Sequence, residues 1–142
     1  MAARKLGIRL RQVHADYDPE IERALATVAR EQVDGLILSG ELLYWMNRYR
    51  IPTFANSLRL PTIYGARQYV TFGGLVSFGT RYADGWYTMG VYAARILKGE
   101  KPSELPVQQI TKTELVLNLK TAKEMGLPIP ATILARADEV LE

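Results

Sequence analysis

The 142-residue sequence contains no cysteine and only one histidine, His14. The absence of cysteine excludes disulfide scaffolds and thiol catalysis, and a single histidine cannot build a multi-histidine metal cluster. No apolar run approaches the ~20 residues that a membrane-spanning helix needs. The first seven residues also lack the apolar core and cleavage site of an export signal, so the chain read alone predicts a cytoplasmic protein.

A strong charge of one sign is also missing. The 18 lysines and arginines exceed the 15 acidic residues by three, and this excess is dispersed along the chain, which is weak support for nucleic-acid binding. The aromatic and basic residues over 44–50 could suit a single strand, but aromatic residues at helical spacing more often pack on a neighbour. We therefore expect no nucleic-acid partner. The length suits one domain, and we expect a single α/β domain over residues 1–142.

Short apolar segments alternate with helical patterns along the chain. Leu6–His14 alternates and predicts a half-buried strand, whereas the continuous apolar run 36–38 predicts a strand buried on both faces. The helical pattern over 42–58 contains Pro52, which predicts either a kink or two helices. The other expected elements are helices over 19–31, 81–98, 121–125 and 130–141, and strands over 60–65, 74–79 and 114–119.

This alternation predicts an α/β fold in three layers, with a mostly parallel sheet and helices on both faces. In such sheets ligands bind beyond the carboxyl ends of the strands. Glycine there permits close backbone approach, hydroxyl groups orient polar ligand atoms, and phenylalanine offers a stacking face. Ordinary turns use similar residues, and spacing alone leaves both interpretations open. The candidate ligand-binding residues at these strand ends are Ser39, Gly40, Glu41, Tyr64, Gly65, Ser77 and Phe78.

Motifs for nucleotide binding and catalysis are absent. The glycines within 73–79 match neither a phosphate-binding loop nor a dinucleotide fingerprint. Ser39 lies in Ser-Gly-Glu and not in a nucleophile elbow, and the single carboxylates Glu41 and Asp84 do not form a glycosidase pair. We therefore expect a protein that is not an enzyme and that uses no cofactor and no metal.

Five segments carry motifs in a recognisable order. Residues 60–79 read Leu-Pro-Thr-Ile-Tyr-Gly at their start and Gly-Gly-Leu-Val-Ser-Phe-Gly at their end, and further motifs lie in 82–84, 96–107, 111–123 and 134–140. Together they resemble the family of ABC-transporter substrate-binding proteins that includes tryptophan-binding and tyrosine-binding lipoproteins. The resemblance covers most of the chain and is strongest from Leu60 onward.

The resemblance implies a type I periplasmic-binding-protein fold, in which two α/β lobes close over a small ligand. That ligand is commonly an aromatic or other amino acid, and the binding protein presents it to an ABC permease. The chain would correspond to the second, C-terminal lobe, with the strand-end residues at 39–41, 64–65 and 77–78 as its pocket wall. The family location is periplasmic, or at the cell surface as a lipoprotein.

A lobe without its counterpart would leave cleft-facing apolar side chains uncovered. Exposed patches of that kind favour association, so we expect a homo-oligomer. An alternative hypothesis is a truncated lobe that keeps the fold, has no transport role and acts only as an oligomerising interaction module.

Overall fold

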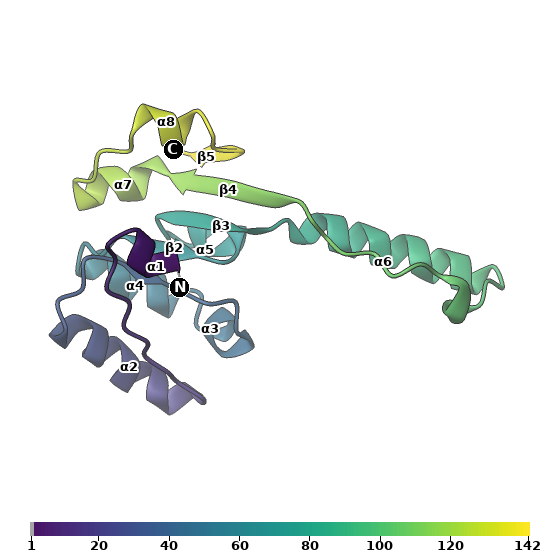
Figure 1. Ribbon diagram of the computed structural model, residues 1–142, viewed down its shortest axis with the longest axis horizontal. Coiled ribbons are helices and arrows are strands. Elements are labelled where there is room, and N and C mark those ends of the chain that lie inside the picture. Colours follow the sequence, from purple (N-terminus) through teal and green to yellow (C-terminus); the bar gives the residue numbers. More distant parts are fainter. Residues whose placement is uncertain (1) are drawn as a thin grey trace. The chain divides into compact units, whose positions relative to one another are not determined.

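The computed structural model describes residues 2–142, which divide into two compact units that meet at the Asp34–Gly35 bond (Figure 1). The first unit contains helices α1 (Ala2–Lys5) and α2 (Asp18–Arg30). The second unit contains all strands of the described residues. That the whole chain forms one domain equivalent to a second lobe remains a prediction.

Helix α2 confirms the expected helix over 19–31. It begins one residue earlier than predicted, because Tyr17 is the N-cap and Asp18 is already helical. The carboxylate of Glu20 accepts a hydrogen bond from the backbone N–H of Asp16 at 2.9 Å, which satisfies a donor near the helix start. One face of the helix is buried along its length and consists of Ile21, Leu25 and Val28.

The predicted strand over Leu6–His14 is wrong. Residues 8–15 have no strand assignment, and the alternating side chains Leu6, Ile8 and Leu10 are 73%, 54% and 62% exposed. Alternation shows only that a segment could lie in a sheet, since a strand also needs a neighbour for its backbone hydrogen bonds. In the first unit of the structure no such neighbour is present among the described residues.

The second unit is built on a five-stranded sheet in the order β1-β2-β3-β4-β5. Strands β1, β2 and β3 are parallel, β4 runs antiparallel to β3, and β5 is parallel to β4. This arrangement confirms the predicted mostly parallel α/β sheet. The strands are β1 (Leu36–Ile37), β2 (Thr62–Tyr64), β3 (Val76–Thr80), β4 (Thr113–Asn118) and β5 (Glu139–Leu141).

Helices cover one face of this sheet and only part of the other, where Ile37, Ile63 and Phe78 are 72%, 44% and 58% exposed. On one face Tyr64 stacks on Tyr69 of α5 at 4.9 Å between ring centroids, and the buried side chain of Ile51 from α4 joins this core. On the other face Ala122 and Met125 of α7 pack near the start of β3. The helices of the second unit are α3 (Leu42–Met46), α4 (Arg50–Ser57), α5 (Arg67–Thr71), α6 (Tyr82–Leu97), α7 (Leu119–Met125) and α8 (Ala131–Leu134), with a 3₁₀ turn at Pro102–Glu104.

Two expectations for this unit need correction. The run 36–38 is not buried on both faces, because β1 lies at the edge of the sheet and Ile37 is 72% exposed. The expected last helix over 130–141 is only α8, followed by β5. There the backbone N–H of Asp138 donates to the carbonyl of Leu115 at 2.9 Å, so pairing with β4 overrides the helical pattern.

The remaining helix predictions hold. The pattern over 42–58 forms two helices, and Pro52 sits in the first turn of α4, where a missing N–H is tolerated. Helix α6 ends as predicted before Gly99, whose φ of 101° lies in the left-handed region. Among residues 2–142, no helix combines the length and apolarity required to cross a membrane.

Helix α6 and the segment that follows it form an arm, defined here as residues 82–111. Figure 1 shows the chain leaving β3 into α6 and returning beside this helix to β4. The hydroxyl of Tyr92 donates to the carbonyl of Pro106 at 2.5 Å, which joins the two limbs. At the base, the backbone N–H of Arg81 donates to the carbonyl of Lys112 at 3.1 Å. None of the residues of α6 is buried.

Candidate functional site

One edge of the sheet gathers the carboxyl ends of β1, β2 and β3, and glycines bring these strand ends into close contact. A Cβ on Gly65 would lie 3.8 Å from the Cα of Gly40, so the loops after β1 and β2 are adjacent. A Cβ on Gly79 would lie 2.1 Å from the carbonyl oxygen of Gly65, a distance that no real side chain can occupy. The three strand ends are therefore adjacent, and it is at Gly79 that their close approach requires glycine.

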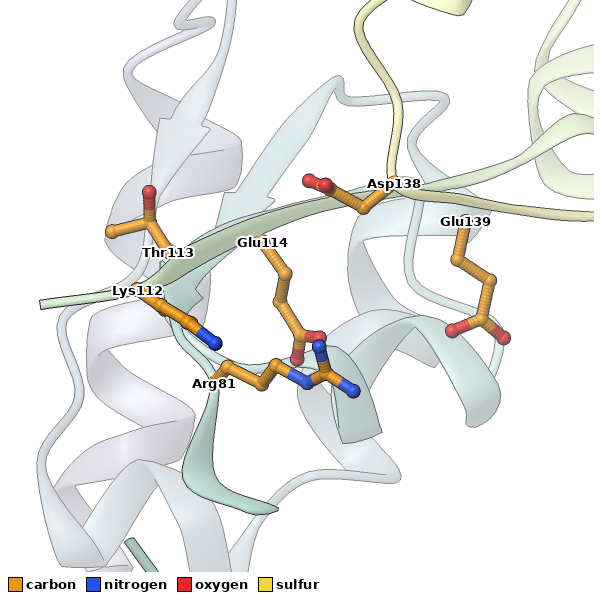
Figure 2. Close-up of a pocket in the computed structure, with 6 residues that line it drawn as sticks. All are labelled: Arg81, Lys112, Thr113, Glu114, Asp138 and Glu139. Carbon is orange, nitrogen blue, oxygen red and sulfur yellow. The ribbon is translucent and has the colours of Figure 1, made fainter. Parts of the chain in front are cut away.

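An open pocket of about 300 Å³ lies at the same edge (Figure 2). It is located where β3 ends and where β4 and β5 begin, because β4 and β5 run opposite to β3. Most of its lining side chains are charged, and both signs are present. The lining residues are Arg81, Lys112, Thr113, Glu114, Asp138 and Glu139.

A bidentate ion pair closes one side of this pocket. The guanidinium of Arg67 at the start of α5 donates to both carboxylate oxygens of Glu139, at 2.6 Å and 2.5 Å. These hydrogen bonds raise the pKa of Arg67 and hold the pKa of Glu139 below its ordinary value. The pair joins residues that are far apart in the chain, and both side chains are about a third exposed, which screens the attraction.

Asp138 is also used within the fold. Its carboxylate accepts a hydrogen bond from the backbone N–H of Leu115 at 2.8 Å. This contact closes the start of β5 onto β4 and satisfies an edge donor. Arg81 is engaged more weakly, since its Nε lies 3.9 Å from a carboxylate oxygen of Asp84 and its side chain is 54% exposed.

The structure divides the sequence-predicted site residues into two groups. Ser39, Gly40 and Glu41 are exposed in the loop after β1, and Gly65 is half-buried beside them. These four residues lie at the sheet edge, as the topology predicted. Their contact with a ligand remains a prediction.

The other predicted residues lie elsewhere. Tyr64 and Ser77 are register partners on the covered face of the sheet and are each 1% exposed. Phe78 is 58% exposed, but as the neighbour of Ser77 it points to the opposite face. The Ser77 hydroxyl has no hydrogen-bond partner among the described residues. A role of these three side chains in ligand contact stays a prediction, and none of them lines the pocket.

The buried tyrosines on this face are neutral phenols. Burial raises the pKa of Tyr64 far above its ordinary value, an effect that the Thr62 side chain partly offsets. Burial is also the main cause that raises the pKa of Tyr69 to about 12. The two stacked rings belong to the buried cluster with Ile51 and Ala66 and supply packing without charge.

Sequence reasoning missed the charged residues that line the pocket. The rule it used follows the carboxyl ends of parallel strands, whereas Lys112, Thr113 and Glu114 stand at the amino end of an antiparallel strand. Asp138 and Glu139 fell within an expected helix. The alternation of Leu115, Leu117 and Leu119 was the available signal, because it placed a strand start at this point of the chain.

A mostly parallel sheet whose strand ends meet at a charged, open pocket is typical of α/β proteins that bind small ligands at that edge. The comparisons make this class specific. A family model described as ABC transporter substrate binding protein matches residues 1–141. The chain belongs to this family, which confirms the resemblance found in the sequence.

Solved structures agree with this assignment. A conserved domain protein from Vibrio cholerae O1 biovar eltor is 29% identical and superposes with a TM-score of 0.85. An ABC domain in complex with L-Trp from Streptococcus pneumonia is 27% identical, also with a TM-score of 0.85. Each alignment covers 98% of this chain and 47% of the other chain.

A curated relative is the tyrosine-binding protein of Clostridioides difficile strain R20291. It is 24% identical over 108 residues, which are 76% of this chain and 31% of the relative. The chain thus spans less than half the length of each of these three proteins.

Proposed function

We propose that this chain is the ligand-binding second lobe of an ABC-type import system and that it holds a small, amino-acid-like solute at the sheet edge without catalysis. The observation that carries the proposal is the mixed-charge pocket at the sheet edge where the ends of β1, β2 and β3 lie side by side and Gly79 packs against the Gly65 carbonyl. Family membership supports the same conclusion. An ABC permease is the partner that this role requires.

The relatives support an aromatic amino acid as the ligand class. One is described as a tyrosine-binding protein, and another was solved in complex with L-Trp. A binding protein that delivers solutes to an import permease acts outside the cytoplasmic membrane, so we also propose that location. A single lobe contacts only one side of its ligand, and we expect weak binding.

Backbone amide NMR of the isotope-labelled chain tests this proposal. Titration with L-tryptophan, L-tyrosine and the other common amino acids should shift the amides of Gly40, Gly65 and Arg81 in a saturable way. Maltose, a neutral solute without an amino-acid head group, is the matched control and should leave these amides unchanged. If no amino acid shifts the amides of the sheet edge, the proposed function is wrong.

The exposed arm favours a second candidate function, an interaction module that self-associates. At helical spacing, one side of α6 presents Tyr82, Trp86, Met89, Ala93, Ile96 and Leu97. Trp86 and Leu97 are 68% and 87% exposed. We name these six residues the apolar stripe. The return limb packs on another side of the helix, where a Cβ on Gly85 would lie 2.5 Å from Ile110 Cδ1.

A second copy of this chain is the occupant that we propose for the apolar stripe. Large apolar side chains at these exposures present on the order of 500 Å². Two facing stripes would bury on the order of 1,000 Å², the lower limit for a specific interface. A second copy would also bring the total length near that of the structural neighbours, each of which is about twice as long as this chain.

Sedimentation equilibrium over a range of protein concentrations tests self-association. The unchanged chain should form dimers, and Trp86→Glu or Leu97→Asp should weaken dimerisation about tenfold or more, because each places a charge in an apolar contact. Leu42→Asp changes an exposed leucine of α3 outside the arm and serves as the control. A chain that is monomeric at every concentration would exclude the interaction module.

A further inference from the structure

We propose that the open pocket at the base of the arm binds the head group of a zwitterionic amino acid. Arg81 and Lys112 would bind its carboxylate, and Glu114 its ammonium group. This inference rests on the proposed function, since it specifies which part of an amino-acid ligand the described residues recognise. It also predicts that both charges of the ligand are needed.

The first step is to separate the charges that the fold already uses. Glu139 is held by the bidentate contact with Arg67, and Asp138 accepts from the backbone of Leu115. These two carboxylates serve the attachment of β5. They are therefore not the acceptors that we assign to a ligand.

The second step concerns the charges that remain available. Among residues 2–142, the side chains of Lys112 and Glu114 form no hydrogen bond and no ion pair, but Glu114 interacts electrostatically with Arg67, which is itself paired with Glu139. Arg81 has only the 3.9 Å contact with Asp84, close to the limit for an ion pair. Arg81, Lys112 and Glu114 are thus the lining charges without a hydrogen-bonded partner, and they lie beside the two carboxylates that the fold already engages.

The third step is that the backbone points these groups to one side of the sheet. Lys112 directly precedes β4 and Glu114 is its second residue, so on an extended chain the two side chains leave the same side. Glu114 is the register partner of Gly79, and Arg81 follows Gly79 by two residues on the neighbouring chain segment. Figure 2 shows the side chains of Arg81, Lys112 and Glu114 directed into a common space.

Gly79 gives this space its shape. Gly79, the register partner of Glu114, lies with its backbone against the Gly65 carbonyl, so position 79 places no side chain between Glu114 and the loop after β2. A ligand head group held by Glu114 would therefore leave the rest of the molecule free to lie along the glycine-rich strand ends. This placement connects the pocket with Gly40 and Gly65 of the sequence-predicted site.

The charge pattern selects among ligand classes. A carboxylate gains two cationic partners and an ammonium group gains one anionic partner, so a zwitterion satisfies all three side chains. A ligand with only one of the two charges leaves part of the pocket unpaired. Neutral sugars offer neither charge, and dianions are repelled by Glu114.

Three indole compounds separate the two charges in an experiment. L-Tryptophan carries both charges, tryptamine lacks the carboxylate, and indole-3-propionate lacks the ammonium group. In amide NMR titrations of the full chain, we expect tryptamine and indole-3-propionate to bind severalfold more weakly than L-tryptophan, because one exposed ion pair is lost in each case.

Charge-removing variants assign each ligand group to a side chain. Arg81→Gln should weaken L-tryptophan and indole-3-propionate severalfold and leave tryptamine unchanged. Glu114→Gln should weaken L-tryptophan and tryptamine and leave indole-3-propionate unchanged. Lys123→Gln and Glu124→Gln on the exposed side of α7 are matched controls, and amide spectra of each variant show that it is folded.

The outcomes of this experiment distinguish the two proposals. Suppose that L-tryptophan shifts the edge amides, that both variants bind it as tightly as the unchanged chain, and that both analogues bind as tightly as L-tryptophan. The head-group site is then wrong and the proposed function stands. If neither L-tryptophan nor another amino acid shifts these amides, the proposed function is wrong and the head-group site fails with it. If Arg81→Gln weakens only the ligands with a carboxylate and Glu114→Gln only those with an ammonium group, both proposals are supported.

Discussion

The sheet and the arm of the second unit differ in how far their apolar side chains are exposed. In the sheet, Val116 and Leu117 of β4 are 0% and 1% exposed. In the arm, Trp86 is 68% exposed and Leu97 is 87% exposed, although these are also large apolar side chains. The same unit thus contains a region in which apolar side chains are buried and a region in which they are exposed to solvent.

This contrast shows which interactions stabilise each region. Burial of apolar surface is the main favourable contribution in the sheet. The arm relies on local contacts: the helical hydrogen bonds of α6, the link from Tyr92 to Pro106 and the bidentate pair of Arg95 with Glu100. Because these contacts do not use the apolar stripe, the stripe stays available for a partner.

Truncation of one leucine in each region should give the largest difference. Leu117→Ala removes a fully buried side chain, and we expect it to lower the free energy of unfolding by about 3 kcal/mol. Leu97→Ala removes a side chain that is exposed in the single chain and, at protein concentrations too low for self-association, should change this free energy by less than about 0.5 kcal/mol. Urea unfolding followed by circular dichroism measures both values.

These two variants can also show that the sheet and the arm do not differ in how their apolar side chains are packed. An equal loss of stability in both would mean that Leu97 is packed in solution, on a second copy or on another surface. Repeating the unfolding at several protein concentrations distinguishes these cases, because only stabilisation by a second copy depends on concentration.

Glycine-to-alanine changes should give smaller individual effects, and these should have opposite signs in the sheet and in the arm. Gly79→Ala would place its Cβ against the Gly65 carbonyl, and separating the two backbones should cost about 2 kcal/mol. Gly90→Ala lies within α6 with no heavy atom within 4 Å, and it should stabilise the helix by about 0.5–1 kcal/mol.

Thermal and urea unfolding of the two glycine variants test this expectation. A stable Gly79→Ala protein would show that the strand ends separate easily and that the edge is not a rigid surface. A destabilised Gly90→Ala protein would show that α6 is not an exposed regular helix. Either result would weaken the distinction between the two regions.

The elements that sequence reasoning predicted correctly are those with local signals. Helix α2 has an amphipathic face, α6 ends at Gly99, and α7 ends at Gly126 with its φ of 72°. The errors lie where pairing over long sequence distance decides the outcome. Leu6–His14 has the alternation of a strand but no ladder, and β5 has a helical pattern but pairs with β4.

The candidate site was predictable in position but not in its side chains. The strand-end rule located the sheet edge that contains Ser39, Gly40 and Gly65. It could not show that the last residue of β2, Tyr64, points into the core, because the register with Ser77 decides its face. It also could not foresee an antiparallel strand that delivers Lys112 and Glu114 to the same edge.

The hydrogen bond between Arg81 and Lys112 at the base of the arm also affects how the chain folds. Strands β3 and β4 pair over five register positions, although the whole arm separates them in sequence. Closing so long a flexible loop has an entropic cost and slows folding. An arm that first forms its own hairpin places Arg81 beside Lys112 and reduces this search. Strands β3 and β4 should therefore pair faster than their separation along the chain predicts.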